Sequence, residues 1–134
     1  MPKGLRPITT YNVFQTGSGG AYASGARTIT KNTSVTSGAI PLGEIAQNGI
    51  FSLEYLITGD GTIKIEYLLC STKDGTYVEP TSAVDIASGL TKNSGTSGHD
   101  IISFEPEMAP WMKLKVTETG TSSDAVVTLI LNVQ

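Results

Sequence analysis

The chain has 134 residues, one cysteine and one histidine, and a formal net charge of −3 at pH 7. This length predicts one domain with a core of its own. A single cysteine excludes an internal disulfide and a cysteine-based metal cluster. Residues 1–43 carry four basic side chains and no acidic one, whereas residues 44–134 carry five lysines and all twelve acids. The charge therefore divides into a basic front segment and an acidic body.

Within this front segment, residues 1–38 are rich in Gly, Ser and Thr. Residues 6–14 have the composition of a short strand, and Pro7 at its start is typical of an edge strand. A stretch like 15–38 buries too little apolar surface to order itself. The sequence therefore predicts an extended arm over 1–38 that mainly contacts other chains. The candidate contact residues in this arm are Arg6, Tyr11, Phe14, Tyr22, Arg27 and Lys31.

Alternating apolar and polar residues predict strands in the rest of the chain. Residues 50–58 and 62–71 flank Gly59-Asp60-Gly61, which predicts a hairpin, and residues 76–80 extend it to a three-stranded meander. Residues 82–90 fit a short strand or a helical turn. Further strands are expected at 39–42, 100–106, 111–119 and 125–134. Strands at this spacing, with no convincing helix, predict an all-β sandwich of jelly-roll or immunoglobulin-like type over 39–134.

The apolar phase of these strands predicts the core. Six side chains are expected to be almost fully buried: Leu53, Ile63, Ile65, Leu114, Val127 and Leu129. Cys70 follows two leucines, and we expect it to be a small buried hydrophobe with an unreactive thiol.

Residue combinations that could support catalysis are weak. His99-Asp100 has serines nearby but no Gly-x-Ser-x-Gly turn, so His99 is expected to be an exposed loop residue. Glu54 and Glu66 lie on polar strand faces, where solvated carboxylates are more plausible than a glycosidase pair. The sequence therefore predicts no enzyme activity, no catalytic residue, no cofactor and no metal site.

Other ligand classes have thin support as well. Four basic residues spread over 43 positions beside an acidic body argue against a nucleic-acid partner. No apolar run is long enough to cross a bilayer, and the first residues do not resemble a signal peptide, so we expect cytoplasmic synthesis and no membrane partner. Trp111 could stack on a sugar or contact a protein surface, although a lone tryptophan more often caps a core.

Two stretches of the acidic body share their order of strands and turns with a known group of proteins. They are GDGTIKIEYLLCSTKDGTYVEP at 59–80 and HDIISFEPEMAPWMKLKVTETGTSSDAVVTLILNVQ at 99–134. Residues 50–134 thereby resemble small virion proteins of tailed bacteriophages. The resemblance implies a capsid decoration or cement subunit, made in the host cytoplasm and located in the virion. Its implied partners are the major capsid protein and copies of itself, as a homodimer or homotrimer. The alternatives are a tail or baseplate subunit and a carbohydrate-binding β-sandwich module.

Overall fold

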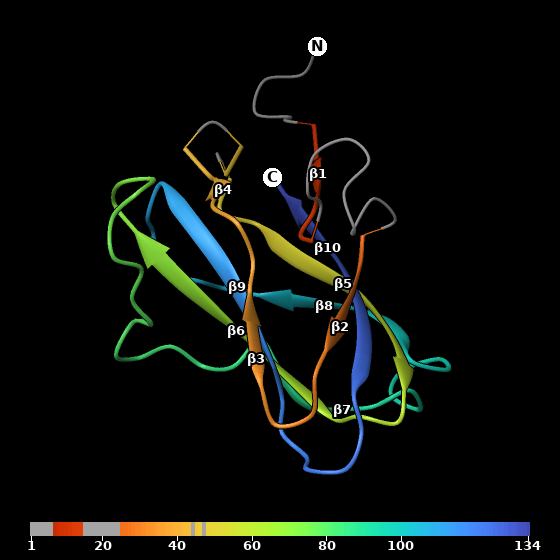
Figure 1. Ribbon diagram of the computed structural model, residues 1–134. Coiled ribbons are helices and arrows are strands. Elements are labelled where there is room, and N and C mark those ends of the chain that lie inside the picture. The colour runs from red at the N-terminus through yellow and green to blue at the C-terminus, as the bar shows by residue number, and fades with distance from the viewer. Residues whose placement is uncertain (1–6, 15–24, 44, 47) are drawn as a thin grey trace.

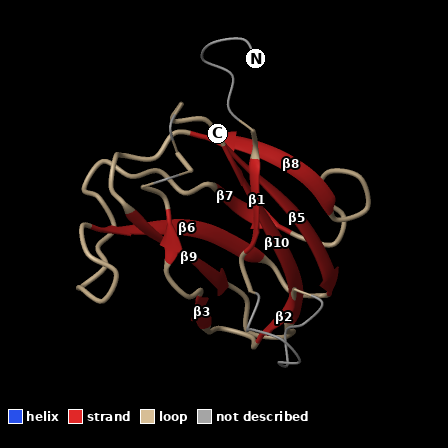
Figure 2. Ribbon diagram, turned by 90° about the horizontal axis from the view of Figure 1, so that it is seen from above, coloured by secondary structure: helices blue, strands red, loops and turns tan. Residues whose placement is uncertain are grey.

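The computed structural model describes residues 7–14, 25–43, 45–46 and 48–134. These residues form ten strands and no helix, arranged as two antiparallel sheets packed face to face (Figure 1). Viewed along the sandwich, the two sheets lie side by side as separate layers (Figure 2). The predicted all-β sandwich is confirmed. Within these residues no helix is long and apolar enough to cross a membrane.

The first sheet is built around β10. This strand pairs with β5 on one side, while β1 and β2 share its other side, β1 beside residues 130–133 and β2 beside residues 125–128. β8 pairs with β5 and forms the far edge. The strands of this sheet are β1 (Thr9–Asn12), β2 (Ala26–Ile29), β5 (Phe51–Gly59), β8 (His99–Phe104) and β10 (Ala125–Val133).

The second sheet repeats this plan around β9. β6 pairs with β9 on one side, and β3 and β4 share the other side. β7 pairs with β6 and forms the far edge. The strands of this sheet are β3 (Ser34–Thr36), β4 (Ile40–Pro41), β6 (Ile63–Cys70), β7 (Ala87–Leu90) and β9 (Trp111–Glu118).

Strand partners are nested along the chain. β6 pairs with β7, β5 with β8, β3 and β4 with β9, and β1 and β2 with β10. The chain therefore has the topology of one long hairpin wrapped around the core, in which successive pairs of partner strands lie in alternate sheets. This is the arrangement of a jelly roll, and it resolves the choice left open between jelly-roll and immunoglobulin-like sandwiches.

The predicted meander is wrong. The turn at Gly59-Asp60-Gly61 joins β5 to β6, but these strands lie in different sheets and each is flanked by other partners. The turn packs tightly against the start of β10, since a Cβ on Gly61 would lie 2.9 Å from the Ala125 nitrogen. Residues 76–80 contribute only an isolated bridge, between Val78 and Leu69.

The predicted core is confirmed. All six side chains expected in it have 0% exposure, and the alternation assigned to β5, β6, β9 and β10 matches the structure. Each strand buries one face against the opposite sheet, which is the physical reason that period-two patterns identify core residues.

The described part of the front segment belongs to the sandwich, so the predicted arm is wrong for these residues. β1, β2 and β3 complete the edges of both sheets. Val13, Phe14 and Ile29 have 3%, 4% and 0% exposure and lie in the common core. Gly, Ser and Thr do not order by themselves, but here the β-branched and aromatic residues between them gain strand partners and buried surface within the same chain. Residues 1–6 and 15–24 lie outside the described residues.

Candidate functional site

The residues predicted to contact other chains do not form one surface. Phe14 is buried in its own core, so its assignment to an intermolecular contact is wrong. Tyr11 is half-buried and packs against the core beside β10. Arg27 is half-buried on the same edge, opposite Val127. Arg6 and Tyr22 lie outside the described residues.

Lys31 and Trp111 lie at separate places on the surface. Lys31 is exposed in the turn after β2, where its backbone N–H donates to the Asp124 carboxylate at 2.8 Å. Trp111 is half-buried and lies between Pro41 and Cys70 in the register of the second sheet. Its successor Met112 faces the core with 0% exposure, so Trp111 faces outward. It therefore does not cap the core.

Four strongly exposed apolar side chains lie at one end of the sandwich. Ile8, Ile50, Val78 and Met108 have exposures of 63%, 57%, 56% and 80%. They lie next to strand termini at the end of the sandwich where β1, β5 and β9 begin and β6, β8 and β10 end. We call these four residues the apolar end. An exposed apolar group of this kind is typical of an interaction surface.

Hollows separate the side chains of the apolar end. A hollow of about 440 Å³ lies between Met108 and the pair Val78 and Pro80. Met108 also lines a second hollow of about 340 Å³, together with Leu42 and Pro110. Met108 therefore projects between two concave regions, and its unbranched side chain can adapt to a contacting surface.

Backbone hydrogen bonds hold this end in place. The Leu42 N–H donates to the Pro110 carbonyl at 2.8 Å, which connects β4 to the segment that carries Met108. The N–H groups of Asn48 and Ile50 both donate to the carbonyl of Gln134, at 3.0 and 3.1 Å. The apolar end is thus a preorganised surface, so its contacts require little ordering.

An acidic cleft of about 500 Å³ lies next to the apolar end. Its walls include Tyr67, Asp85, Phe104, Glu105 and Glu107. The Tyr67 hydroxyl donates to the Glu107 carboxylate at 2.5 Å. Burial, this hydrogen bond and the negative charge of Glu107 raise the pKa of Tyr67 to about 12.

Two further expectations about polar residues are corrected. His99 is exposed as expected, but it lies in β8 and not in a loop, with Nε2 at 2.6 Å from the Glu54 carboxylate. Glu66 was expected to be solvated, yet it has only 7% exposure. The loop that precedes β7 brings Glu79 and Asp85 to it, and sequence alternation carries no signal for this cover.

Cys70 differs most from its prediction. It occupies the outward phase of β6 opposite Trp111 and is half-exposed, because Leu69 takes the inward position. Hydrogen bonding from the backbone of Thr72, together with weaker bonds from Ser71 and Gly75, lowers the pKa of the Cys70 thiol. The thiol is therefore only partly buried, and its surroundings favour the thiolate more than those of an isolated cysteine do.

Comparisons with known proteins leave the family open. No family model matches the chain, and no curated protein matches it. Among solved structures, a chain in the structure of infectious bursal disease virus Gx strain is similar, with a TM-score of 0.45 and 12% sequence identity. The match covers 96% of this chain and spans 32% of that chain. A likeness at this level carries no argument about function.

Proposed function

We propose that this chain is a non-enzymatic structural protein of a virion and acts as a decoration or cement subunit on a phage capsid. The observation that carries the proposal is the apolar end, with Met108 projecting between two hollows on a rigid jelly roll. Jelly rolls are frequent in viral coats, which is compatible with the proposal, but the fold alone does not define a function. The resemblance of residues 50–134 to small phage virion proteins supports the same role.

The proposed partners are the major capsid protein and further copies of this chain, as a homodimer or homotrimer. Contact with a capsid subunit would remove the exposed side chains of Ile8, Ile50, Val78 and Met108 from water, at roughly 25 cal/mol for each Å² of apolar surface. Of the residues predicted from sequence, Tyr11 and Trp111 remain proposed contacts near this end, opposite Leu131 of β10 and at the start of β9. Arg27 and Lys31 lie beside the start of β10, away from the apolar end, and remain proposed contacts with a separate neighbour. Location in the virion, after synthesis in the host cytoplasm, is part of the proposal.

A pair of matched substitutions tests the role of the apolar end. Met108→Lys places a charge at the centre of the apolar end, where Met108 has 80% exposure. Val84→Lys is the control, because it places the same charge outside the apolar end, at an apolar residue in the loop before β7 with 77% exposure. Neither residue is buried, so both variants are expected to fold. Binding to particles that lack the protein is expected to fall at least tenfold for Met108→Lys and to stay within twofold of wild type for Val84→Lys. Equal binding of both variants would contradict the proposed contact.

Copy number in purified particles tests the role itself. A decoration or cement subunit is expected at a number close to that of the major capsid protein, and quantitative mass spectrometry of intact particles measures this ratio. A tail or baseplate subunit would be present in far fewer copies. Absence from the particle would refute a virion role of any kind.

A further inference from the structure

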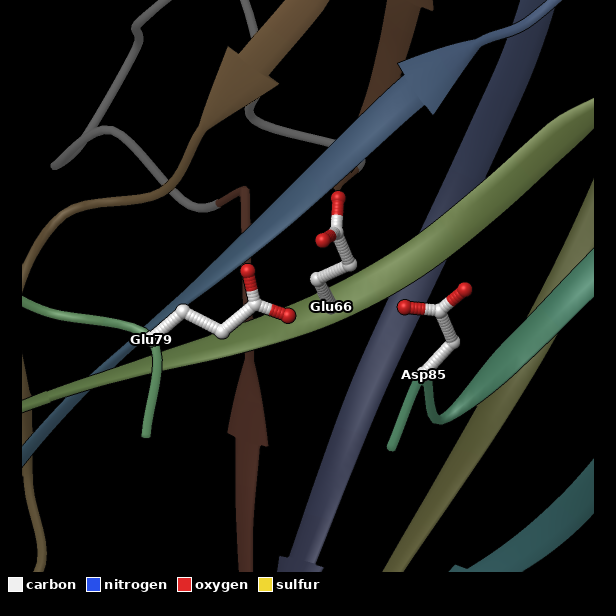
Figure 3. Close-up of side chains that lie close together, drawn as sticks. All are labelled: Glu66, Glu79 and Asp85. Atoms are coloured by element: carbon white, nitrogen blue, oxygen red, sulfur yellow. The ribbon is translucent and has the colours of Figure 1, made fainter. Parts of the chain in front are cut away.

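Three carboxylates converge on the outer side of the second sheet. Glu66 comes from β6, and the carboxylates of Glu79 and Asp85 lie on either side of its side chain (Figure 3). One oxygen from each residue lies within 4.8 Å of the other two. These three residues are referred to below as the acidic cluster.

The backbone fixes the positions of the two outer carboxylates. Val78, which precedes Glu79, exchanges two backbone hydrogen bonds of 2.9 Å with Leu69 of β6. Ile86, which follows Asp85, donates its N–H to the carbonyl of Ile65 of β6 at 2.8 Å. Both ends of segment 79–85 are therefore attached to β6, on either side of Glu66. This anchoring brings the backbone of Glu79 and Asp85 to the stretch of β6 that carries Glu66.

Glu66 is the buried member of the acidic cluster, and one of its carboxylate oxygens lacks a hydrogen bond. Its exposure is 7%, and its Oε1 atom is buried without a hydrogen bond. Lys64 Nζ lies 3.5 Å from that oxygen, at a geometry that forms an ion pair but no hydrogen bond. A buried carboxylate is costly unless it is both paired and hydrogen-bonded. Lys115 of β9 lies opposite Glu66 in the register of the sheet, so two lysines, Lys64 and Lys115, stand beside three carboxylates. One negative charge therefore remains unbalanced, and Glu66 Oε1 still lacks a hydrogen bond.

We propose that the acidic cluster binds a calcium ion. All the offered ligand atoms are carboxylate oxygens, which hard cations prefer. Calcium holds oxygen ligands at about 2.3–2.6 Å, so ligands on opposite sides of one ion are roughly 5 Å apart, close to the spread of the cluster. Magnesium, at about 2.0–2.1 Å, would need the oxygens to lie within roughly 4.2 Å and in near-octahedral geometry. Water completes the coordination sphere on the exposed side.

Calcium bound here would join the two ends of segment 79–85 to β6 and to each other. Pro80 of this segment lines a hollow at the apolar end, and Ser82, Val84 and Asp85 line the acidic cleft. The ion would therefore stabilise the walls of both regions. Binding is independent of the proposed virion role, because it depends only on the three carboxylates.

The test uses the full-length chain freed of metal with a chelator and dialysed. Thermal unfolding and isothermal titration calorimetry are measured with calcium chloride up to about 10 mM, an order of magnitude above the weakest dissociation constants of extracellular calcium modules. We expect a saturable rise in Tm of several degrees and a measurable binding heat. Magnesium chloride, matched in ionic strength, is expected to produce a much smaller response.

Matched variants locate the site. Glu79→Gln and Asp85→Asn change exposed carboxylates and are expected to fold, while weakening calcium binding at least tenfold. Glu54→Gln, on the outer face of the first sheet, is the control and is expected to bind calcium like wild type. The proposal is overturned if wild type shows neither heat nor a Tm shift at the highest calcium concentration. It is also overturned if Asp85→Asn responds like wild type, or if magnesium has the same effect as calcium.

Discussion

Phe14→Ala tests whether the front segment belongs to the core of its own chain or forms an arm that contacts other chains. In the structure Phe14 has 4% exposure and packs in the core with Val13 and Ile29. Truncation of a buried phenylalanine costs about 3–5 kcal/mol, from lost transfer free energy and the cavity that remains. An arm residue that contacts only another subunit would leave the free energy of unfolding of the isolated chain almost unchanged.

The expected loss is large relative to the stability of a domain. Typical free energies of unfolding are about 5–15 kcal/mol. The unfolding entropy is roughly 2.1 cal/mol/K per residue. For a chain of 134 residues, each 1 kcal/mol lost from the free energy of unfolding therefore lowers Tm by about 3.6 °C. Phe14→Ala should therefore lower Tm by about 11–18 °C.

Urea unfolding, followed by circular dichroism and by Trp111 fluorescence, measures this loss. The measurement is repeated over a tenfold range of protein concentration, so that any contribution from association is separated. Ile8→Ala is the control, since Ile8 lies in the same segment with 63% exposure and its truncation is expected to change stability by less than about 0.5 kcal/mol. A loss below about 1 kcal/mol for Phe14→Ala would refute its place in the core and restore the arm interpretation.

The remaining predictions concern the core, the thiol and the buried tyrosine. Leu129→Ala should cost about 2–5 kcal/mol in urea unfolding because Leu129 has 0% exposure, and a loss below about 1 kcal/mol would mean that the phase of β10 is wrong. Cys70 should react with a thiol reagent in the native protein, at a rate whose pH midpoint lies below the ordinary thiol pKa; protection until unfolding would contradict its exposure and lowered pKa. Tyr67 should remain protonated in the native state until the pH approaches 12, as measured by absorbance at alkaline pH. Because its folded pKa is above the unfolded value of 10.0, its contribution to stability is complete below pH 10 and declines as the pH rises toward 12; Tyr67→Phe should remove this decline.

The candidate surfaces could be predicted only in part. Met108 lies outside the predicted strands, and Val78 lies in the segment 76–80 that was predicted as a strand but forms only an isolated bridge, so the sequence indicated the exposure of neither residue. Glu66 was correctly placed on the outward face of β6, but its burial depends on segment 79–85, which returns to β6 through Val78 and Ile86. Cys70 has the outward phase of the same strand, and applying that phase strictly would have predicted its exposure.

Alternation along single strands was sufficient to identify the core residues of β5, β6, β9 and β10, but not Phe14 or Ile29 in the short strands of the front segment. Alternation is a local property of each strand, and every strand of a sandwich buries one face, so Leu53, Ile65 and Leu129 could be assigned without knowing their neighbours. The pairing of each strand, by contrast, depends on contacts between residues that are distant in the chain. An alternating strand fits either sheet equally well, because both sheets bury their inner faces against the same core. Thus Gly59-Asp60-Gly61 is as compatible with a hairpin as with the observed crossing from β5 to β6. The choice depends on contacts distant in the chain, such as those of β10 with β1 and β5 at Val133, where Thr9 and Phe51 both pair.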